Sequence, residues 1–192
     1  MADSATRDRI VETADRLFYR QGFEHTSFAD IAGAVKISRG NFYYHFRTKD
    51  EILDAVIARR LAGTKAMLGQ WEDAAERPEE RIERFIRILL VNRADIRRWG
   101  CPVGTLSGEL ARLGHAAEGE ARALFVLFRT WLRRQFALMG RSADADQLAM
   151  HVLAMSQGVA TLANAFDDTR FIRREVERML AWLAEIREEV RP

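Results

Sequence analysis

The stretch TSFADIAGAVKISRGNFYYHF, residues 26–46, decides the fold of the N-terminal part of the chain. Ser27 followed three residues later by Asp30 is a capping-box pattern, which predicts a helix start. Apolar residues at positions 28, 31, 32 and 35 give this short helix a buried side. Ser38 then begins a second short helix that we expect to end near Phe46. Two short helices joined by a tight turn at residues 35–37 are typical of a helix-turn-helix motif.

Helical patterns continue on both sides of this stretch. Apolar residues recur at helical spacing from position 10 to 18, and Gly22 then predicts a C-terminal stop. Thr48 stands three residues before Glu51 and opens a long helix. Pro78 marks another helix start, and the periodicity runs on toward the C-terminus. The sequence therefore predicts an all-α chain of about nine helices.

Composition limits the class of protein. The 192 residues are 48% hydrophobic and 30% charged, which excludes wholesale disorder, and they include only three prolines and twelve glycines, which argues against a β-sandwich. One cysteine excludes an internal disulfide framework. The uncharged stretch 147–166 is too polar for a membrane span, and the first residues lack a secretory signal. We expect a soluble cytoplasmic protein.

Charge is distributed evenly except in one window. The net charge is +2, but no acidic residue lies between Asp30 and Asp50. That window holds Lys36, Arg39 and Lys49, together with a pair of tyrosines. A basic, aromatic segment without acids favours a polyanionic partner such as nucleic acid.

A characteristic pattern runs through residues 10–18, Gly22-Phe23, residues 26–32 and residues 35–46, followed by Lys49 and Leu53. On these segments the N-terminal quarter of the chain resembles the TetR family of bacterial repressors. The departures are mild: the family often has Gly-Val at positions 36–37 and Leu at position 42. The resemblance implies a helix-turn-helix DNA-binding domain at residues 1–48, and an effector-binding and dimerisation domain at residues 49–192. It also implies release from a pseudo-palindromic DNA operator by a small, largely apolar ligand.

The residues expected to contact DNA lie on and around the second short helix. Arg39 suits a guanine edge or a phosphate, and Asn41 suits adenine, a phosphate or solvent. The resemblance assigns the aromatic cluster at 43–45 to the DNA backbone. For Thr26 and Ser27, capping alone is a sufficient alternative. The predicted DNA contacts are Thr26, Ser27, Lys36, Ser38, Arg39, Asn41, Tyr43, Tyr44, His45 and Lys49.

Two C-terminal segments carry apolar residues at a regular 4-3-4-3-4 spacing. Such narrow seams pack against another helix, either within one chain or between two copies related by a two-fold axis. We expect the second arrangement, a homodimer. The predicted interface residues are Leu148, Val152, Met155, Val159, Leu162 and Phe166 in the first segment, and Ile172, Val176, Met179, Leu183 and Ile186 in the second, whose spacing continues to Val190.

The domain from residue 49 onward holds enough large apolar side chains to line an effector pocket, although an ordinary helical core would use the same residues. The candidate pocket residues are Trp71, Phe85, Trp99, Cys101, His115, Phe125, Phe128, Trp131, His151 and Met155.

Cys101 suggests an alternative, a repressor that senses electrophiles or redox state. It stands in the segment Gly100-Cys101-Pro102-Val103-Gly104 just before a predicted helix, where a cysteine can react as a thiolate. The sequence shows no glycine-rich phosphate loop, no HExxH motif and no metal-ligand spacing of Cys and His. We therefore expect neither catalysis, nor a metal, nor a cofactor.

Overall fold

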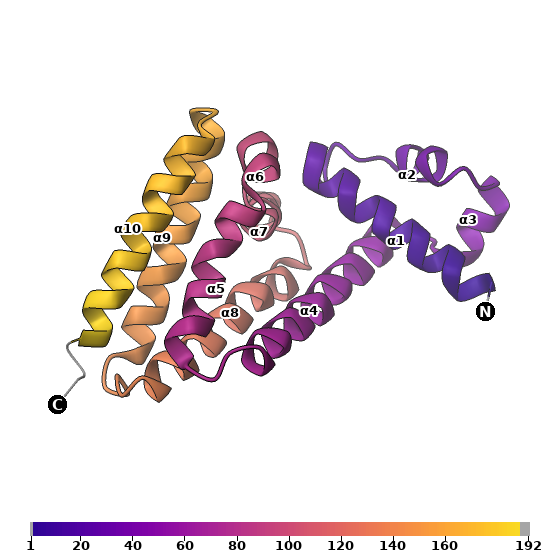
Figure 1. Cartoon of the computed structure of the whole chain (residues 1–192). Helices are drawn as coiled ribbons and strands as arrows, with labels where there is room; N and C mark the ends of the chain where they lie inside the picture. The colour runs from indigo at the N-terminus through magenta and orange to yellow at the C-terminus, as the bar shows by residue number, and fades with distance from the viewer. Residues whose placement is uncertain (1, 189–192) are drawn as a thin grey trace. The chain divides into compact units, whose positions relative to one another are not determined.

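Ten helices make up residues 2–188, the part of the chain that the computed structural model describes, and this part contains no strand (Figure 1). The predicted all-α fold is confirmed. The helices are α1 (Ala2–Gln21), α2 (Phe28–Val35), α3 (Arg39–His45), α4 (Lys49–Asp73), α5 (Pro78–Val91), α6 (Arg93–Trp99), α7 (Pro102–Leu113), α8 (Glu118–Leu138), α9 (Ala145–Ala165) and α10 (Thr169–Glu188).

The helix beyond the predicted nine comes from a break at Asn92. The segment from Pro78 to Trp99 reads as one helical pattern, but Asn92 adopts φ −96° and ψ 10°, ends α5 and precedes α6. No side-chain cap marks this break, because Asn92 makes no capping hydrogen bond there. The periodicity of apolar residues continues across it, so the sequence pattern alone does not reveal the interruption.

The chain divides into two compact units. The first extends to Gly63 and includes Thr105–Leu124, and the second comprises Thr64–Gly104 and the chain from Phe125 onward. The first unit thus continues past the domain boundary predicted at residue 48, because the N-terminal half of α4 packs with α1–α3. Ile52, Leu53 and Val56 of α4 share one core with Ile10 and Phe42.

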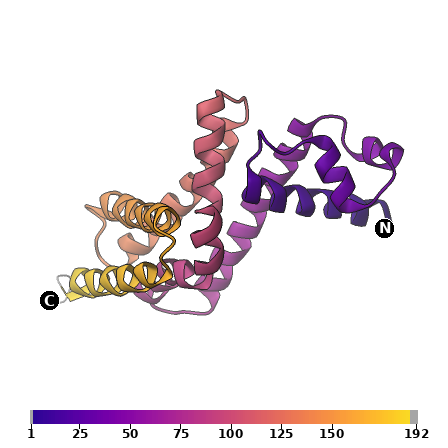
Figure 2. The ribbon, with the colours of Figure 1, turned by 90° about the horizontal axis from the view of Figure 1, so that it is seen from above.

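In the second unit, α10 packs against α5 and α9, and α6 packs against α9. Figure 2 shows α9 and α10 side by side, and their buried faces meet residues of α5 and α8 in one core. Ile82, Ile86, Leu132 and Phe136 are completely buried there. None of the described helices is long and apolar enough to cross a membrane.

Candidate DNA-binding interface and effector cavity

The turn between α2 and α3 is built from two caps. Lys36 ends α2 in a left-handed conformation, φ 57° and ψ 49°, and its backbone N–H donates to the carbonyl oxygen of Ala32. Ser38 precedes α3 and its hydroxyl oxygen accepts a hydrogen bond from the N–H of Asn41 at 3.3 Å. The left-handed conformation at a helix end normally favours glycine, and here it is adopted by Lys36, an exposed basic residue. The structure thus contains the helix-turn-helix unit that the pattern predicts.

One face of α3 is anchored in the core and the opposite face is exposed. Phe42 is 1% exposed, and its ring meets the edge of Phe28 at 4.7 Å between centroids. Tyr43 and Tyr44 are 48% and 73% exposed. Arg39 and Asn41 are exposed as well. The Tyr43 ring also contacts the Phe28 ring at 5.3 Å between centroids, while the exposed parts of both tyrosines accompany a cation and an amide. Such a surface has the composition of a nucleic-acid contact.

Gly40 belongs to the same exposed face. A Cβ atom added there would meet no other atom of the described chain within 4 Å. The glycine is therefore not required for packing against a neighbouring helix of the described chain. The open space beside it permits close approach of an external molecule.

Ser27 caps α2, whereas Thr26 is buried and cannot reach DNA. Ser27 Oγ accepts from the N–H of Asp30 at 3.1 Å, and the Asp30 carboxylate accepts from the Ser27 N–H at 2.8 Å. The hydrogen bonds from the Ser27 hydroxyl and from its backbone N–H hold the pKa of Asp30 below its ordinary value. Thr26 is 0% exposed, and its hydroxyl donates to the carbonyl oxygen of Gly22 at 2.6 Å. The predicted phosphate contact by Thr26 is therefore corrected: its hydroxyl closes the end of α1.

Lys49 is half-buried and already bound. Its ammonium group donates to the carbonyl oxygens of Phe23 and Glu24 at 2.9 and 3.3 Å and lies 4.2 Å from the centre of the Phe23 ring. These contacts direct the cation to the loop between α1 and α2. The predicted phosphate contact at Lys49 therefore has to compete with three internal interactions. His45 is half-buried at the end of α3, and its ring meets Tyr44 edge-on at 5.2 Å.

The same loop is held from its other side by Glu109 of α7, a residue that the sequence analysis did not single out for this role. The Glu109 carboxylate accepts the backbone N–H groups of Phe23 and Glu24, each at 2.9 Å. We call Lys49, Glu109 and the dipeptide Phe23-Glu24 the loop clamp. Gly22 is required beside it, because its φ is 89° and a Cβ there would lie 2.9 Å from a Glu109 oxygen. All four backbone polar groups of the dipeptide thus bind two charged side chains.

The second unit contains a cavity of about 220 Å³. Its walls come from α4, α5, α6, α8 and α9 and from the segment around Cys101, and no charged residue is among them. The lining residues are Thr64, Met67, Phe85, Ile88, Leu89, Asn92, Ile96, Cys101, Pro102, Val103, Phe125, Phe128, Leu153, Ser156 and Gln157. Four of them, Phe85, Cys101, Phe125 and Phe128, are among the ten predicted pocket residues.

The other six predicted pocket residues lie elsewhere. Trp71 and Trp131 pack edge-on at 5.9 Å, and His151 is exposed beside Trp182. Met155 packs at the border of the core, and Trp99 lies next to the guanidinium of Arg98. His115 belongs to the first unit, where its Nδ1 accepts the N–H of Ala117 and its Nε2 lies 3.5 Å from Asp50. Large apolar residues face every core of a helical protein, so residue type alone could not select the cavity walls.

Cys101 lies at one wall of the cavity and is contacted by Gly104 of its own segment and by Gln157, a residue that the sequence did not single out. The N–H of Gly104 and the side-chain Nε2 of Gln157 both donate to the Cys101 sulfur at 3.5 Å. A Cβ at Gly104 would lie 2.4 Å from Oε1 of Gln157, so the glycine permits close approach of this amide. The glycine-rich segment around Cys101 was the available signal, whereas nothing in the sequence pairs it with Gln157.

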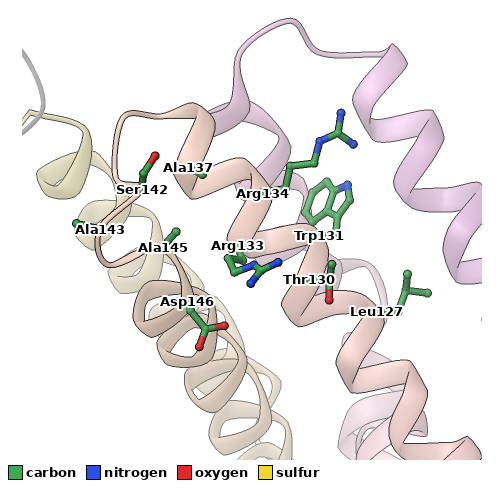
Figure 3. A pocket seen from close by; sticks show the side chains of 10 residues that line it. All are labelled: Leu127, Thr130, Trp131, Arg133, Arg134, Ala137, Ser142, Ala143, Ala145 and Asp146. Carbon is green, nitrogen blue, oxygen red and sulfur yellow. The ribbon is translucent and has the colours of Figure 1, made fainter.

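Trp131 borders a different hollow, an open groove of about 750 Å³ between α8 and the start of α9 (Figure 3). Figure 3 shows Thr130, Trp131 and Arg133 on α8, and Asp146 on α9. Arg129 binds the Asp146 carboxylate at 2.5 and 2.8 Å and lowers its pKa. The groove therefore combines apolar walls with charged side chains, unlike the cavity.

Most of the predicted interface seam lies in the core of its own chain. The five α10 residues from Ile172 to Ile186 are all buried, because α10 packs on α5 and α9. Val152 and Val159 of α9 are buried too, while Leu148 and Met155 are half-buried. This placement corrects the predicted seam; Val190 lies outside the described residues.

The exposed side of α9 presents a different face, which contains no charged residue. Leu162 is 44% exposed and Phe166, directly after the helix, is 75% exposed. They continue a row of exposed residues that are mostly small or apolar. The row, called the α9 face below, consists of Gln147, Met150, His151, Ala154, Gly158, Thr161, Leu162, Ala165 and Phe166.

Comparisons with known proteins agree with this geometry. Residues 10–56 match the family model of bacterial regulatory proteins, tetR family. The HTH-type transcriptional repressor DhaR of a Mycobacterium species is 24% identical over 168 residues, 82% of each chain. The HTH-type transcriptional regulator TtgR of Pseudomonas putida is 42% identical over 52 residues, 27% of this chain and 25% of its own. A solved TetR-family regulator from Agrobacterium tumefaciens has the same fold, with a TM-score of 0.81, 23% identity and coverage of 93% of this chain and 97% of its own.

Proposed function

Because the chain belongs to the TetR family of bacterial transcriptional regulators, we propose that it is a cytoplasmic homodimeric repressor that a small ligand releases from a pseudo-palindromic operator. It is a DNA-binding regulator and not an enzyme. The observation that carries the proposal is the exposed face of α3, where Arg39, Asn41, Tyr43 and Tyr44 project without an acidic neighbour on the same helix.

In this proposal α3 enters the major groove and Arg39 reads a base at its N-terminal end. The Arg39 guanidinium can donate two hydrogen bonds to O6 and N7 of guanine. Tyr43 and Tyr44 then bind the phosphate backbone and fix the register of the helix. The N-terminal turn of α3 begins with a serine cap and has no acid, so the helix end and Arg39 both favour a polyanion.

Binding to operator DNA tests this assignment. The substitution Arg39→Ala should weaken affinity by about 1–3 kcal/mol at particular base pairs and relax the preference there. Tyr44→Ala should weaken binding to all sequences alike, and exposed Arg122 of α8 provides a control, Arg122→Ala, that leaves affinity unchanged. An equal loss for Arg39→Ala on every operator variant would return Arg39 to the phosphate-binding class.

Dimerisation is proposed through the α9 face. Nine exposed positions without a charge, ending in a phenylalanine that is 75% exposed, form an apolar surface that a second copy can cover. Gly158 and Ala154 allow close approach of a partner helix in the middle of this row. Two-fold symmetry places the same face on both copies and supplies two recognition helices for the two half-sites.

The cavity is proposed as the effector site. It is lined by residues of five helices and by Pro102 and Val103, the first two residues of α7. A ligand there touches α7 directly and so acts on the helix that also carries Glu109. The test is a titration of operator-bound protein with ligands, read out as DNA release.

A second candidate function, sensing of electrophiles by Cys101, is favoured by one observation. The Cys101 sulfur lines the cavity and accepts hydrogen bonds from two N–H groups, so it is held where an electrophile bound in the cavity would meet it. The expected result is alkylation of Cys101 with loss of operator binding, and no such response in Cys101→Ser. An unchanged response of Cys101→Ser to an electrophile would remove this candidate and leave a reversible ligand.

A further inference from the structure

We propose that the effector is an uncharged aromatic molecule of a single substituted ring, a phenol, whose hydroxyl binds the side-chain amide of Gln157. The inference rests on the proposed function, in which the cavity of the second unit is the effector site. It names the chemistry of the ligand, which follows from three properties of the cavity walls: their charge, their size and aromatic content, and the placement of the Gln157 amide, one of two amides in the lining together with that of Asn92.

The absence of charge in the walls excludes ionic ligands. All fifteen described lining residues are uncharged. An ion that enters such a cavity loses its hydration and gains no counter-charge, so its transfer from water is strongly unfavourable. A neutral molecule avoids this cost. The cavity therefore discriminates against carboxylates, phosphates and ammonium groups.

The size and the aromatic walls favour one ring. A cavity of about 150 Å³ in a protein core holds benzene, and the volume here is about 220 Å³, enough for a ring with a short substituent. Phe85 and Phe128 meet edge-to-face with centroids 5.4 Å apart, and Phe125 adds a third ring. Aromatic walls pack well against the face and edge of an aromatic ligand.

Thr64, Asn92, Ser156 and Gln157 supply polar side chains to the lining, and we place the polar group of the ligand at Gln157 because its amide already bonds Cys101, another lining residue. The hydroxyl of Ser156, the neighbouring lining residue, already donates to the carbonyl oxygen of Leu153 at 2.8 Å. The Gln157 Nε2 donates to the Cys101 sulfur at 3.5 Å, and sulfur is a weak acceptor that an oxygen replaces with gain. A glutamine amide offers one donor group and one acceptor atom. A phenol hydroxyl both donates and accepts, so it can bind at either side of the amide.

Gly104 leaves the space that this amide occupies. An added Cβ at Gly104 would lie 2.4 Å from Gln157 Oε1, which is closer than such contacts occur, while Gly104 itself is not among the lining residues. Gly104→Ala therefore displaces the Gln157 amide without changing the composition of the walls. Gly104→Ala therefore tests the position of the amide, whereas a substitution of Gln157 itself tests its presence.

The experiment uses three probes of similar size, 4-ethylphenol, ethylbenzene and 4-ethylbenzoate, titrated into the full-length protein in a calorimeter at neutral pH, where the phenol is neutral. For a ligand of this size we expect a Kd on the order of 10–100 μM for 4-ethylphenol. Ethylbenzene should bind about two- to tenfold more weakly because it lacks the hydrogen bond. The carboxylate should not bind measurably.

The variants locate the effect. Gln157→Met keeps the side-chain length and should abolish the preference for 4-ethylphenol over ethylbenzene while both still bind, and Gly104→Ala should reduce the same preference. Gln70→Met, at an exposed position of α4, is the control and should retain the wild-type ratio. Binding of ethylbenzene by Gln157→Met also shows that this variant is folded.

Three results would overturn the inference: binding of 4-ethylbenzoate as tight as that of 4-ethylphenol, an unchanged phenol preference in Gln157→Met, or no binding of any probe by protein that binds DNA. Failure of the proposed function gives a different result. If the protein binds 4-ethylphenol as expected but binds no DNA, the ligand site is supported and the assignment as a DNA-binding regulator is wrong.

Discussion

Replacing Glu109 by alanine should loosen the loop between α1 and α2, because the Glu109 carboxylate accepts the N–H groups of Phe23 and Glu24 at 2.9 Å each. A hydrogen bond to a charged group contributes about 1.5–3 kcal/mol. Glu109 is half-buried and Glu24 is exposed, so water can replace part of the second bond. We therefore expect less than the roughly 3–6 kcal/mol that two fully buried bonds would contribute, about 2 kcal/mol in the free energy of unfolding.

The assay is thermal unfolding of the full chain, followed by circular dichroism. For a chain of this length, 2 kcal/mol corresponds to a decrease in Tm of about 4–8 °C. Glu109→Gln retains one acceptor oxygen and should lose about half as much. The matched control is Asp54→Ala, which removes an exposed carboxylate from α4 in the same unit. A Tm for Glu109→Ala within about 1 °C of this control would refute the reasoning that the clamp stabilises the loop.

Four further substitutions test other parts of the structure. Gly40→Ala should stabilise the protein by about 0.5–1 kcal/mol in thermal unfolding yet weaken operator binding, since a Cβ at Gly40 meets no internal atom; unchanged DNA affinity would contradict close approach there. Lys36→Gly should also stabilise, by about 1 kcal/mol, by relieving the left-handed conformation, which denaturant titration measures. Leu162→Glu should lower the dimer association constant measured by sedimentation at least tenfold, because it buries an unpaired charge in the interface. Val126→Glu, at an exposed position of α8, is the control and should leave the constant unchanged. An intact Leu162→Glu dimer would exclude the α9 face as the interface. Asp30→Asn should destabilise the protein at neutral pH but not in acid. The folded pKa of Asp30 is lowered, so the stabilisation by its carboxylate is present above the ordinary carboxyl pKa and is lost as the pH falls through the folded value, below about pH 4. Below that pH, wild type and variant should unfold alike.

Local signals in the sequence were sufficient for the recognition unit. Ser27 with Asp30, the cap at Ser38 and the stop at Gly22 act through bonds to residues within three or four positions, and the structure forms each of them. The apolar stripe from Phe28 to Val35 faces the core because its residues recur at helical spacing, which is also a short-range property of the sequence. Bonds of this range depend on the residues that the pattern contains, so the pattern predicts them.

Contacts between distant residues could not be predicted in the same way. Glu109 binds the backbone N–H groups of Phe23 and Glu24, which lie 86 and 85 positions earlier in the sequence. Every residue except proline has a backbone N–H, so no sequence pattern identifies these two as partners. Gln157 meets Cys101 across 56 positions. The seam on α10 was predicted from its spacing, but spacing does not show whether the partner helix belongs to the same chain. In the structure α5 of the same chain packs on α10, so this seam is buried in the core.

The loop clamp also makes two adjacent amides dependent on one side chain. The hydrogens on Phe23 N and Glu24 N share the carboxylate of Glu109, so a single rotation of that side chain exposes both to solvent at once. Their exchange with deuterated water therefore follows the same opening event, and the two rates should rise and fall together. Any ligand or DNA that shifts Glu109 becomes visible as a paired change at these two amides, next to the exposed residue His25.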